Sequence, residues 1–232
     1  MTNVVIAIDG PAASGKSSTA QWVARKLGYY HVDSGSLYRA ATALQLDSSS
    51  NPEAWTEQTV LAGVARIDFV PARELGTFVA QIDGVTSDDR LRGIEVTRNV
   101  SRVAKMLAVR EWVNAHVRRT AEARNVVVDG RDIGTAVFPE APLKIFLIAD
   151  PWERARRRLI QRLDRHPSDR EIAEETELIV KRDARDATQT VQASDAVLID
   201  TTYLTQEDQV ERIVALARAV TQRPHRTSGI DG

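Results

Sequence analysis

Short apolar runs alternate with longer amphipathic segments along most of the chain. Mostly apolar runs of strand length occupy residues 4–8, 29–32, 126–128, 143–149 and 196–199. Between them, apolar residues recur at the three- and four-residue spacing of a helix, as at Ala20, Val23, Ala24 and Leu27. Runs that are apolar throughout indicate strands covered on both faces, so the pattern predicts an α/β fold with a parallel sheet flanked by helices.

Residues 63–100 follow a different pattern. The segments 65–70 and 78–82 alternate apolar and polar residues, and Asp83-Gly84 is a tight-turn signal. This predicts short antiparallel strands in a small inserted subdomain, distinct from the flanking strand-helix units. A single long helix is then expected over roughly 94–124, with an inward face formed by Val103, Met106, Leu107, Val113 and Val117.

The C-terminal third is predicted to be helical around one last strand. Asp150-Pro151 is expected to begin an arginine-rich helix. The charged stretch 171–185 is expected to form a second helix. Thr205, with Asp208 three residues later, signals the start of a final helix. Its apolar face is formed by Val210, Ile213, Val214, Ala217 and Val220. Residues 223–232 are polar and are expected to form a flexible tail.

The stretch Gly10-Pro-Ala-Ala-Ser-Gly-Lys-Ser17 lies between the first strand and the first helix. Its glycines let the backbone turn so that amide N–H groups and the positive helix end converge on phosphates. Lys16 can then reach the β- and γ-phosphates of a nucleoside triphosphate, and Ser17 can bind Mg²⁺. A chance match to this spacing is roughly a one-in-a-hundred event at average glycine usage, so a plain glycine-rich turn is the weaker interpretation.

Composition narrows the function classes. The chain of 232 residues has a formal net charge of −1, so bulk electrostatics predicts neither a nucleic-acid nor a membrane partner. It contains no cysteine, which excludes disulfides and thiolate metal sites. No apolar run approaches the ~20 residues that span a membrane, and no charged leader precedes the first strand. We therefore expect a cytoplasmic protein.

Arginines are abundant and unevenly placed. Arg131 follows a buried strand and precedes Asp132, at the strand end where parallel sheets bind ligands. Arg154, Arg157 and Arg158 share one helix face, where like charges repel unless an anion is present. A polyphosphate would supply that anion; the alternative is a solvated charged face partnered by nearby glutamate.

Several motifs together resemble the bacterial cytidylate kinases, a family of P-loop nucleoside monophosphate kinases. The resemblance extends from the N-terminus to about residue 220, and the Gly-Arg-Asp-Ile-Gly-Thr stretch at 130–135 is its most specific part. Its motifs are Gly10–Ser17, Asp33-Ser-Gly-Ser-Leu-Tyr-Arg39, Ser101 with Arg110, Asp129-Gly-Arg-Asp-Ile-Gly-Thr-Ala-Val-Phe-Pro139, Ala141–Leu147, Glu153–Arg158, Arg182-Asp-Ala-Arg-Asp186 and Asp195–Asp200.

The resemblance implies a P-loop kinase fold in one domain over residues 1–222. It has a CORE (1–61, 101–155 and 169–222) with a five-stranded parallel sheet, an inserted α+β monophosphate-binding subdomain (62–100) and a short mobile LID (156–168). It also implies transfer of the γ-phosphoryl group of ATP to CMP or dCMP, within pyrimidine nucleotide metabolism. We expect Mg²⁺ as a cofactor and a monomer.

The resemblance assigns site residues by their positions in these motifs. The donor loop is Gly10, Pro11, Ala12, Ala13, Ser14, Gly15, Lys16, Ser17 and Ser18, with Ser17 as the metal ligand. Residues expected to read the cytosine are Ser101, Arg110 and Asp132. Those expected to hold the acceptor phosphate are Ser34, Arg39 and Arg131, while Tyr38 and Asp186 face its sugar. Candidates to bind phosphates at closure are Arg157, Arg158 and Arg182; the groups expected to act in catalysis are Lys16, Arg131, Arg157 and Arg158.

Two other functions stay open at this point. One is a P-loop kinase for another small acceptor, such as UMP, AMP or a non-nucleotide metabolite. The other is a nucleotide-dependent switch or motor acting on a macromolecule. The chain lacks an Asn/Thr-Lys-x-Asp guanine-reading motif and an Asp-Glu dipeptide after a strand, which disfavours the switch or motor.

One segment departs from the family pattern. The family usually has an arginine three residues after Asp186 and then a Pro-Leu pair, whereas this chain has Gln189 and a shorter segment before Asp195. A neutral amide forms weaker hydrogen bonds to anions than a guanidinium does, so we expect weaker acceptor binding than is usual in the family.

Replacing Gln189 by arginine is therefore expected to lower the KM for CMP. An added charge-assisted hydrogen bond of about 1–2 kcal/mol corresponds to a roughly 5–30-fold change. Steady-state kinetics with CMP and dCMP would measure it, and Gln189→Met is the neutral control. An unchanged KM for CMP in Gln189→Arg would contradict the expectation.

Overall fold

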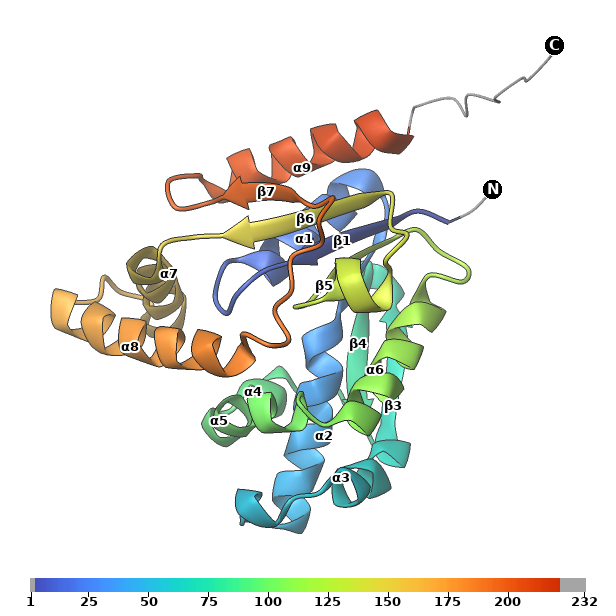
Figure 1. Cartoon of the computed structure of the whole chain (residues 1–232), viewed down its shortest axis with the longest axis vertical. Helices are drawn as coiled ribbons and strands as arrows, with labels where there is room; N and C mark the ends of the chain where they lie inside the picture. The colour runs from blue at the N-terminus through green and yellow to red at the C-terminus, as the bar shows by residue number, and fades with distance from the viewer. Residues whose placement is uncertain (1–2, 222–232) are drawn as a thin grey trace.

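The computed structural model of the chain describes residues 3–221, which form one sheet with helices on both faces (Figure 1). Its strands are β1 (Val5–Asp9), β2 (Tyr30–Asp33), β3 (Ile67–Ala72), β4 (Thr77–Ile82), β5 (Val126–Asp129), β6 (Leu143–Ile148) and β7 (Val197–Asp200). The strand order is β3-β4-β2-β5-β1-β6-β7, and every pairing is parallel except β3 with β4. This confirms the predicted α/β fold.

Nine α-helices lie between and after these strands in the described residues. They are α1 (Lys16–Leu27), α2 (Ser34–Ser48), α3 (Glu57–Gly63), α4 (Asp88–Arg92), α5 (Ile94–Val103), α6 (Leu107–Thr120), α7 (Pro151–Leu163), α8 (Asp169–Asp186) and α9 (Gln206–Thr221). Asp150 caps α7 by accepting hydrogen bonds from the amides of Trp152 and Glu153. Among residues 3–221, no helix is long and apolar enough to cross a membrane.

The sheet has seven strands in the described residues, not the five of the predicted CORE. The five expected strands are adjacent, in the order β2-β5-β1-β6-β7, and the predicted hairpin is antiparallel. The hairpin nevertheless extends the same sheet, because β4 pairs with β2 through His31 opposite Thr77 and Val32 opposite Phe78. That pairing satisfies backbone groups that β2 would otherwise expose at an edge. The division into CORE, insert and LID remains a prediction.

The single helix predicted over 94–124 is wrong, because the chain breaks between α5 and α6 at Ala104–Met106. In one continuous helix, Val109 would lie about 120° around the axis from Val103 at 100° per residue. Both valines are fully buried, and the break lets each helix turn its own apolar face to the core. Leu107, expected to face inward, is 65% exposed.

Each face of the sheet has its own apolar core. Along β1, Val5 and Ala7 pack into one cluster with residues of α2 and α6, while Ile6 and Ile8 pack into another with residues of α1 and α9. The predicted apolar face of α9 joins the second cluster, with Val220 partly buried. The tail predicted from Arg223 onward lies outside the described residues.

Truncation of α6 tests the corrected burial pattern. Val113→Ala removes buried methyl groups from the core cluster that α6 shares with α2 and is expected to lower the free energy of unfolding by about 2 kcal/mol. Leu107→Ala on the same helix is the matched control and is expected to change it by less than about 0.5 kcal/mol. Urea denaturation would measure both. Equal losses would contradict this assignment of the inward face.

Candidate active site

A large open cleft lies at the carboxyl ends of the central strands. Its volume is about 1480 Å³, and its walls come from the loop at 12–18, the start of α2, the turn at 129–133, and α5, α7 and α8. The strands β1, β2 and β5 end there at Asp9, Asp33 and Asp129. The cleft therefore occupies the position where parallel sheets bind ligands.

The loop at 10–17 has the backbone that the glycine spacing predicts. Gly10 and Gly15 have φ angles of 147° and 83°, in the region that favours glycine. A Cβ atom on Gly10 would collide with the carbonyl oxygen of Leu147. Lys16 Nζ lies inside the loop, where it donates to the Pro11 carbonyl over 2.6 Å. Burial lowers the pKa of Lys16, and the nearby Arg131 lowers it further.

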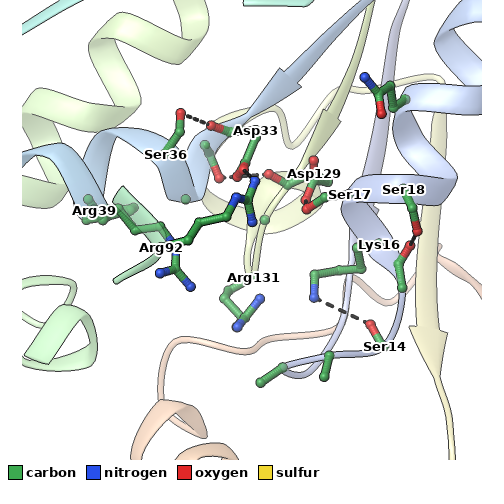
Figure 2. Close-up of a pocket in the computed structure, with 18 of the residues that line it drawn as sticks. Ser14, Lys16, Ser17, Ser18, Asp33, Ser36, Arg39, Arg92, Asp129 and Arg131 are labelled. Carbon is green, nitrogen blue, oxygen red and sulfur yellow. Dashed lines mark hydrogen bonds and ion pairs between the residues drawn. The ribbon is translucent and has the colours of Figure 1, made fainter. Parts of the chain in front are cut away.

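Ser17 is oriented by a buried carboxylate. Its hydroxyl donates to Asp129 Oδ2 over 2.6 Å, and Oδ1 of the same carboxylate lies 2.7 Å from His31 Nε2. Figure 2 shows Ser17 and Asp129 together beside the start of α1. Among residues 3–221, no three His, Asp or Glu side chains cluster as a metal site. An Mg²⁺ ion here would thus depend on the Ser17 hydroxyl and on oxygens from phosphate and water, a donor set that suits this ion.

The residues predicted to read a base lie together on the opposite wall. Arg110 of α6 forms an ion pair with Asp132 and also donates to the Ala104 carbonyl over 3.1 Å. Burial raises the pKa of Asp132, an effect that Arg110 opposes. Ser101 and Tyr38 also line the cleft, and burial raises the pKa of Tyr38 to about 12.

Between these two walls the cleft is strongly cationic. The pKa values of Arg39 and Arg182 are lowered to about 10, mainly by burial and in addition by neighbouring guanidinium groups, including that of Arg131. The Nε atoms of Arg131, Arg154 and Arg182 are buried and form no hydrogen bond among the described residues, although Arg182 Nε lies 3.5 Å from Asp186 Oδ2. Figure 2 shows Arg131 extending into the space beside Lys16. Buried like charges with unused donors are the arrangement expected where an anion binds.

Carboxylates and hydroxyls complete this region. Asp186 lies 3.7 Å from Arg131 and 3.5 Å from Arg182, measured between carboxylate oxygen and guanidinium nitrogen. Ser34 donates to the backbone carbonyl of Asp129 over 2.8 Å. Arg39 donates to the Leu91 carbonyl and to Thr97 Oγ1, so the start of α5 is tied to this wall.

The arginines of α7 do not act as one group. Arg154 is buried away from the cleft, where it donates to the Ala12 carbonyl over 2.8 Å and to Asp183 Oδ2 over 2.7 Å. Arg157 lines the cleft and donates to the carbonyls of Thr201 and Thr202, and Arg158 pairs with the buried Glu175. The polyphosphate interpretation therefore does not extend to Arg154, which supports the loop from behind.

Sequence reasoning missed other residues of the site. Asp9 accepts hydrogen bonds of 2.8 Å from the amides of Ile133 and Gly134, and burial raises its pKa to about 6. Arg92 of α4 lines the cleft 3.5 Å from Asp33. The sequence does mark Asp9, because it is a single acidic residue at the end of an apolar strand. Arg92 had no signal, because only the fold places α4 beside β2.

The Gly10–Ser17 loop at the strand ends and the buried arginines around it are the features of a P-loop kinase, which is the class of this protein. The chain belongs to the cytidylate kinase family, whose model matches residues 6–219. A cytidylate kinase from Limosilactobacillus reuteri (strain DSM 20016) is 41% identical over 215 residues, covering 90% of this chain and 92% of that protein.

A second relative supports the same family. A cytidylate kinase from Alkaliphilus oremlandii (strain OhILAs) is 40% identical over 226 residues, covering 95% of this chain and all of that protein. Among solved structures, a shikimate kinase from Bacteroides thetaiotaomicron is 14% identical with a TM-score of 0.47, covering 95% of this chain and 99% of that one. That structural likeness is too low to support any inference.

Removing the carboxylate that pairs with Arg154 tests the support behind the loop. Asp183→Ala leaves a buried guanidinium without its partner and is expected to lower the free energy of unfolding by about 3–5 kcal/mol. It also removes the acceptor of the Ala12 amide, so the KM for ATP is expected to rise. Glu177→Ala on the same helix breaks only an exposed pair with Lys181 and is the control, with a loss under about 0.5 kcal/mol. An unchanged stability in Asp183→Ala would contradict this role.

Proposed function

We propose that this protein transfers the γ-phosphoryl group of ATP to CMP or dCMP, giving ADP and CDP or dCDP. The observation that carries the proposal is the Arg110–Asp132 ion pair, which lies across a cationic region from the Gly10–Ser17 loop. Family membership supports the same substrates.

The donor half of the site is the loop with Lys16 and Ser17. The loop amides and the start of α1 bind the ATP phosphates, and Lys16 neutralises charge on the transferring group. Ser17, oriented by Asp129, would bind Mg²⁺, which when present neutralises charge between the β- and γ-phosphates. Ser18 and Gln206, joined by a 3.1 Å hydrogen bond, lie at the outer end of this half.

The acceptor half reads the base and holds its phosphate. A carboxylate accepts a hydrogen bond from the exocyclic amine of cytosine, whereas uracil has a carbonyl oxygen there and would be repelled by Asp132. Ser101 and Arg110 complete the base contacts, and Tyr38 and Asp186 face the sugar. Ser34, Arg39 and Arg131 bind the monophosphate, so the segment 62–100, whose Thr97 contacts Arg39, covers the acceptor.

Transfer needs positioning and charge rather than a general base. The second pKa of a phosphate monoester is about 6, so the attacking oxygen is already deprotonated at neutral pH. Arg131 and Arg182 lie where both phosphates would meet, and they hold the reacting groups in line. Closure of 156–168 would bring Arg157 and Arg158 onto the transferring group and exclude water, a competing acceptor.

A coupled kinase assay across CMP, UMP, AMP, GMP and dCMP at one ATP concentration tests the proposal. Turnover is expected with CMP and dCMP and to be much slower with the others. Preferential phosphorylation of UMP or AMP would contradict the assignment of CMP or dCMP as the acceptor. ATP hydrolysis stimulated by nucleic acid, without CMP phosphorylation, would contradict the proposed kinase function.

Asp132→Asn tests base reading. The amide has the same shape but presents a donor as well as an acceptor, so the ratio of kcat/KM for CMP over UMP is expected to fall about 10–100-fold. Asp68→Asn, an equivalent change at an exposed position of β3, is the control and is expected to leave the ratio unchanged. Selectivity that survives Asp132→Asn would argue against this role.

A further inference from the structure

A line of buried hydrogen bonds crosses the sheet beneath the donor loop. It begins at Thr77 of β4, whose Oγ1 lies 3.1 Å from His31 Nδ1. His31 Nε2 lies 2.7 Å from Asp129 Oδ1, and Asp129 Oδ2 accepts the Ser17 hydroxyl over 2.6 Å. The middle pair is buried, with side chains only 8% and 4% exposed. His31 is thus linked to the Ser17 hydroxyl at the start of α1 through one intervening residue, Asp129.

The hydrogen-bond partners of His31 can accommodate a proton on each ring nitrogen. The Thr77 hydroxyl can donate to the backbone carbonyls of His31 and Phe78, at 3.2 and 3.3 Å, which leaves its lone pair for Nδ1–H. The Asp129 carboxylate accepts from Nε2–H. With both nitrogens protonated, His31 is an imidazolium whose two N–H donors are both satisfied.

The charges around His31 agree with this assignment. Burial lowers its pKa, but the hydrogen bond and charge of Asp129 and the charge of Asp33 outweigh burial, so the pKa is raised. Arg92 acts in the opposite direction. The same pairing, with the Ser17 hydroxyl and Lys16, lowers the pKa of Asp129 against its own burial. Both shifts favour the charged form of each partner.

This pair matters because of where Asp129 lies. An unpaired carboxylate under a phosphate-binding loop would oppose anion binding, and it would be free to rotate away from Ser17. The imidazolium neutralises that charge and holds Oδ1, which leaves Oδ2 fixed toward the serine hydroxyl. Thr77 fixes the ring from the other side.

We propose that His31 is a positioning residue for the donor site: as a buried imidazolium it fixes the Asp129 carboxylate so that the Ser17 hydroxyl keeps its orientation at the phosphate loop. This inference rests on the proposed function for its kinetic part. The protonation of His31 and the binding of ATP can be measured without any acceptor.

The experiment compares two substitutions of His31 in the full chain. His31→Gln keeps one N–H donor near the Nε2 position, whereas His31→Leu keeps a similar volume and has no donor. Thr120→Val, which removes a buried side-chain hydrogen bond to the Val117 carbonyl within α6, controls for loss of stability. Thermal unfolding is measured for each protein, and kinetics are compared only well below its Tm.

In His31→Leu, kcat is expected to fall about tenfold, the size of a lost charge-assisted hydrogen bond. The KM for ATP and the Kd for ATP from calorimetry are expected to rise several-fold, with the KM for CMP within twofold of the wild-type value. His31→Gln is expected to recover most of this loss, and Thr120→Val to lower Tm without changing the kinetic constants. A loss of kcat that Gln does not rescue, or an equal rise in both KM values, would overturn the proposal.

Nitrogen-proton NMR supplies the readout that a purely structural role would not change. The wild-type protein is expected to show an imidazole with protons on both ring nitrogens, and these signals are lost in His31→Gln. A neutral His31 ring would overturn the proposal. If the wild-type protein binds ATP but does not phosphorylate CMP, the proposed function fails, while the NMR spectrum and ATP affinity still decide the role of His31.

Discussion

The pairing of β1 with β5 is the contact on which the site depends. Its register places Ile8 opposite Asp129, so the two strands end at the same level. The donor loop leaves one strand and the Gly130–Asp132 turn leaves the other, and a hydrogen bond from the Gly130 amide to the Ile8 carbonyl joins them. The carboxylate of Asp9 then binds the amides that follow Asp132. Through these contacts, Asp132, the residue proposed to read the base, is held by the strand that carries the phosphate loop.

The cleft concentrates buried charge of both signs at a cost in stability. Guanidinium groups lower one another's pKa, and desolvation penalises each of them. Carboxylates are placed where they offset part of this cost: Asp186 beside Arg131 and Arg182, Asp183 behind Arg154, and Asp129 beside His31. The net charge of the side chains that line the cleft is positive. A site preorganised for two polyanions needs this excess, because the donors must be in place before the phosphates arrive.

Much of the fold and site could be predicted from local pattern. The strands, the loop at 10–17, the capping of the last helix and the placement of Arg131 and Asp132 at a strand end follow from periodicity and turn chemistry. The break at Ala104–Met106 could not be predicted, because the sequence there contains neither proline nor glycine. Its cause is the separate burial of two valine faces, which depends on which helices lie opposite.

The sequence by itself determined the chemistry: a loop whose spacing suits phosphate, arginines in excess at strand ends, and motifs that place the chain among cytidylate kinases. Only the tertiary structure decided which charged side chains line the cleft. It turned Arg154 inward against Asp183, joined the 67–82 hairpin to β2, and brought Thr77 and Asp129 to either side of His31. The reason is physical: spacing along a chain reports local geometry, whereas the partner of a buried charge comes from sequence-distant strands that meet only when the sheet forms.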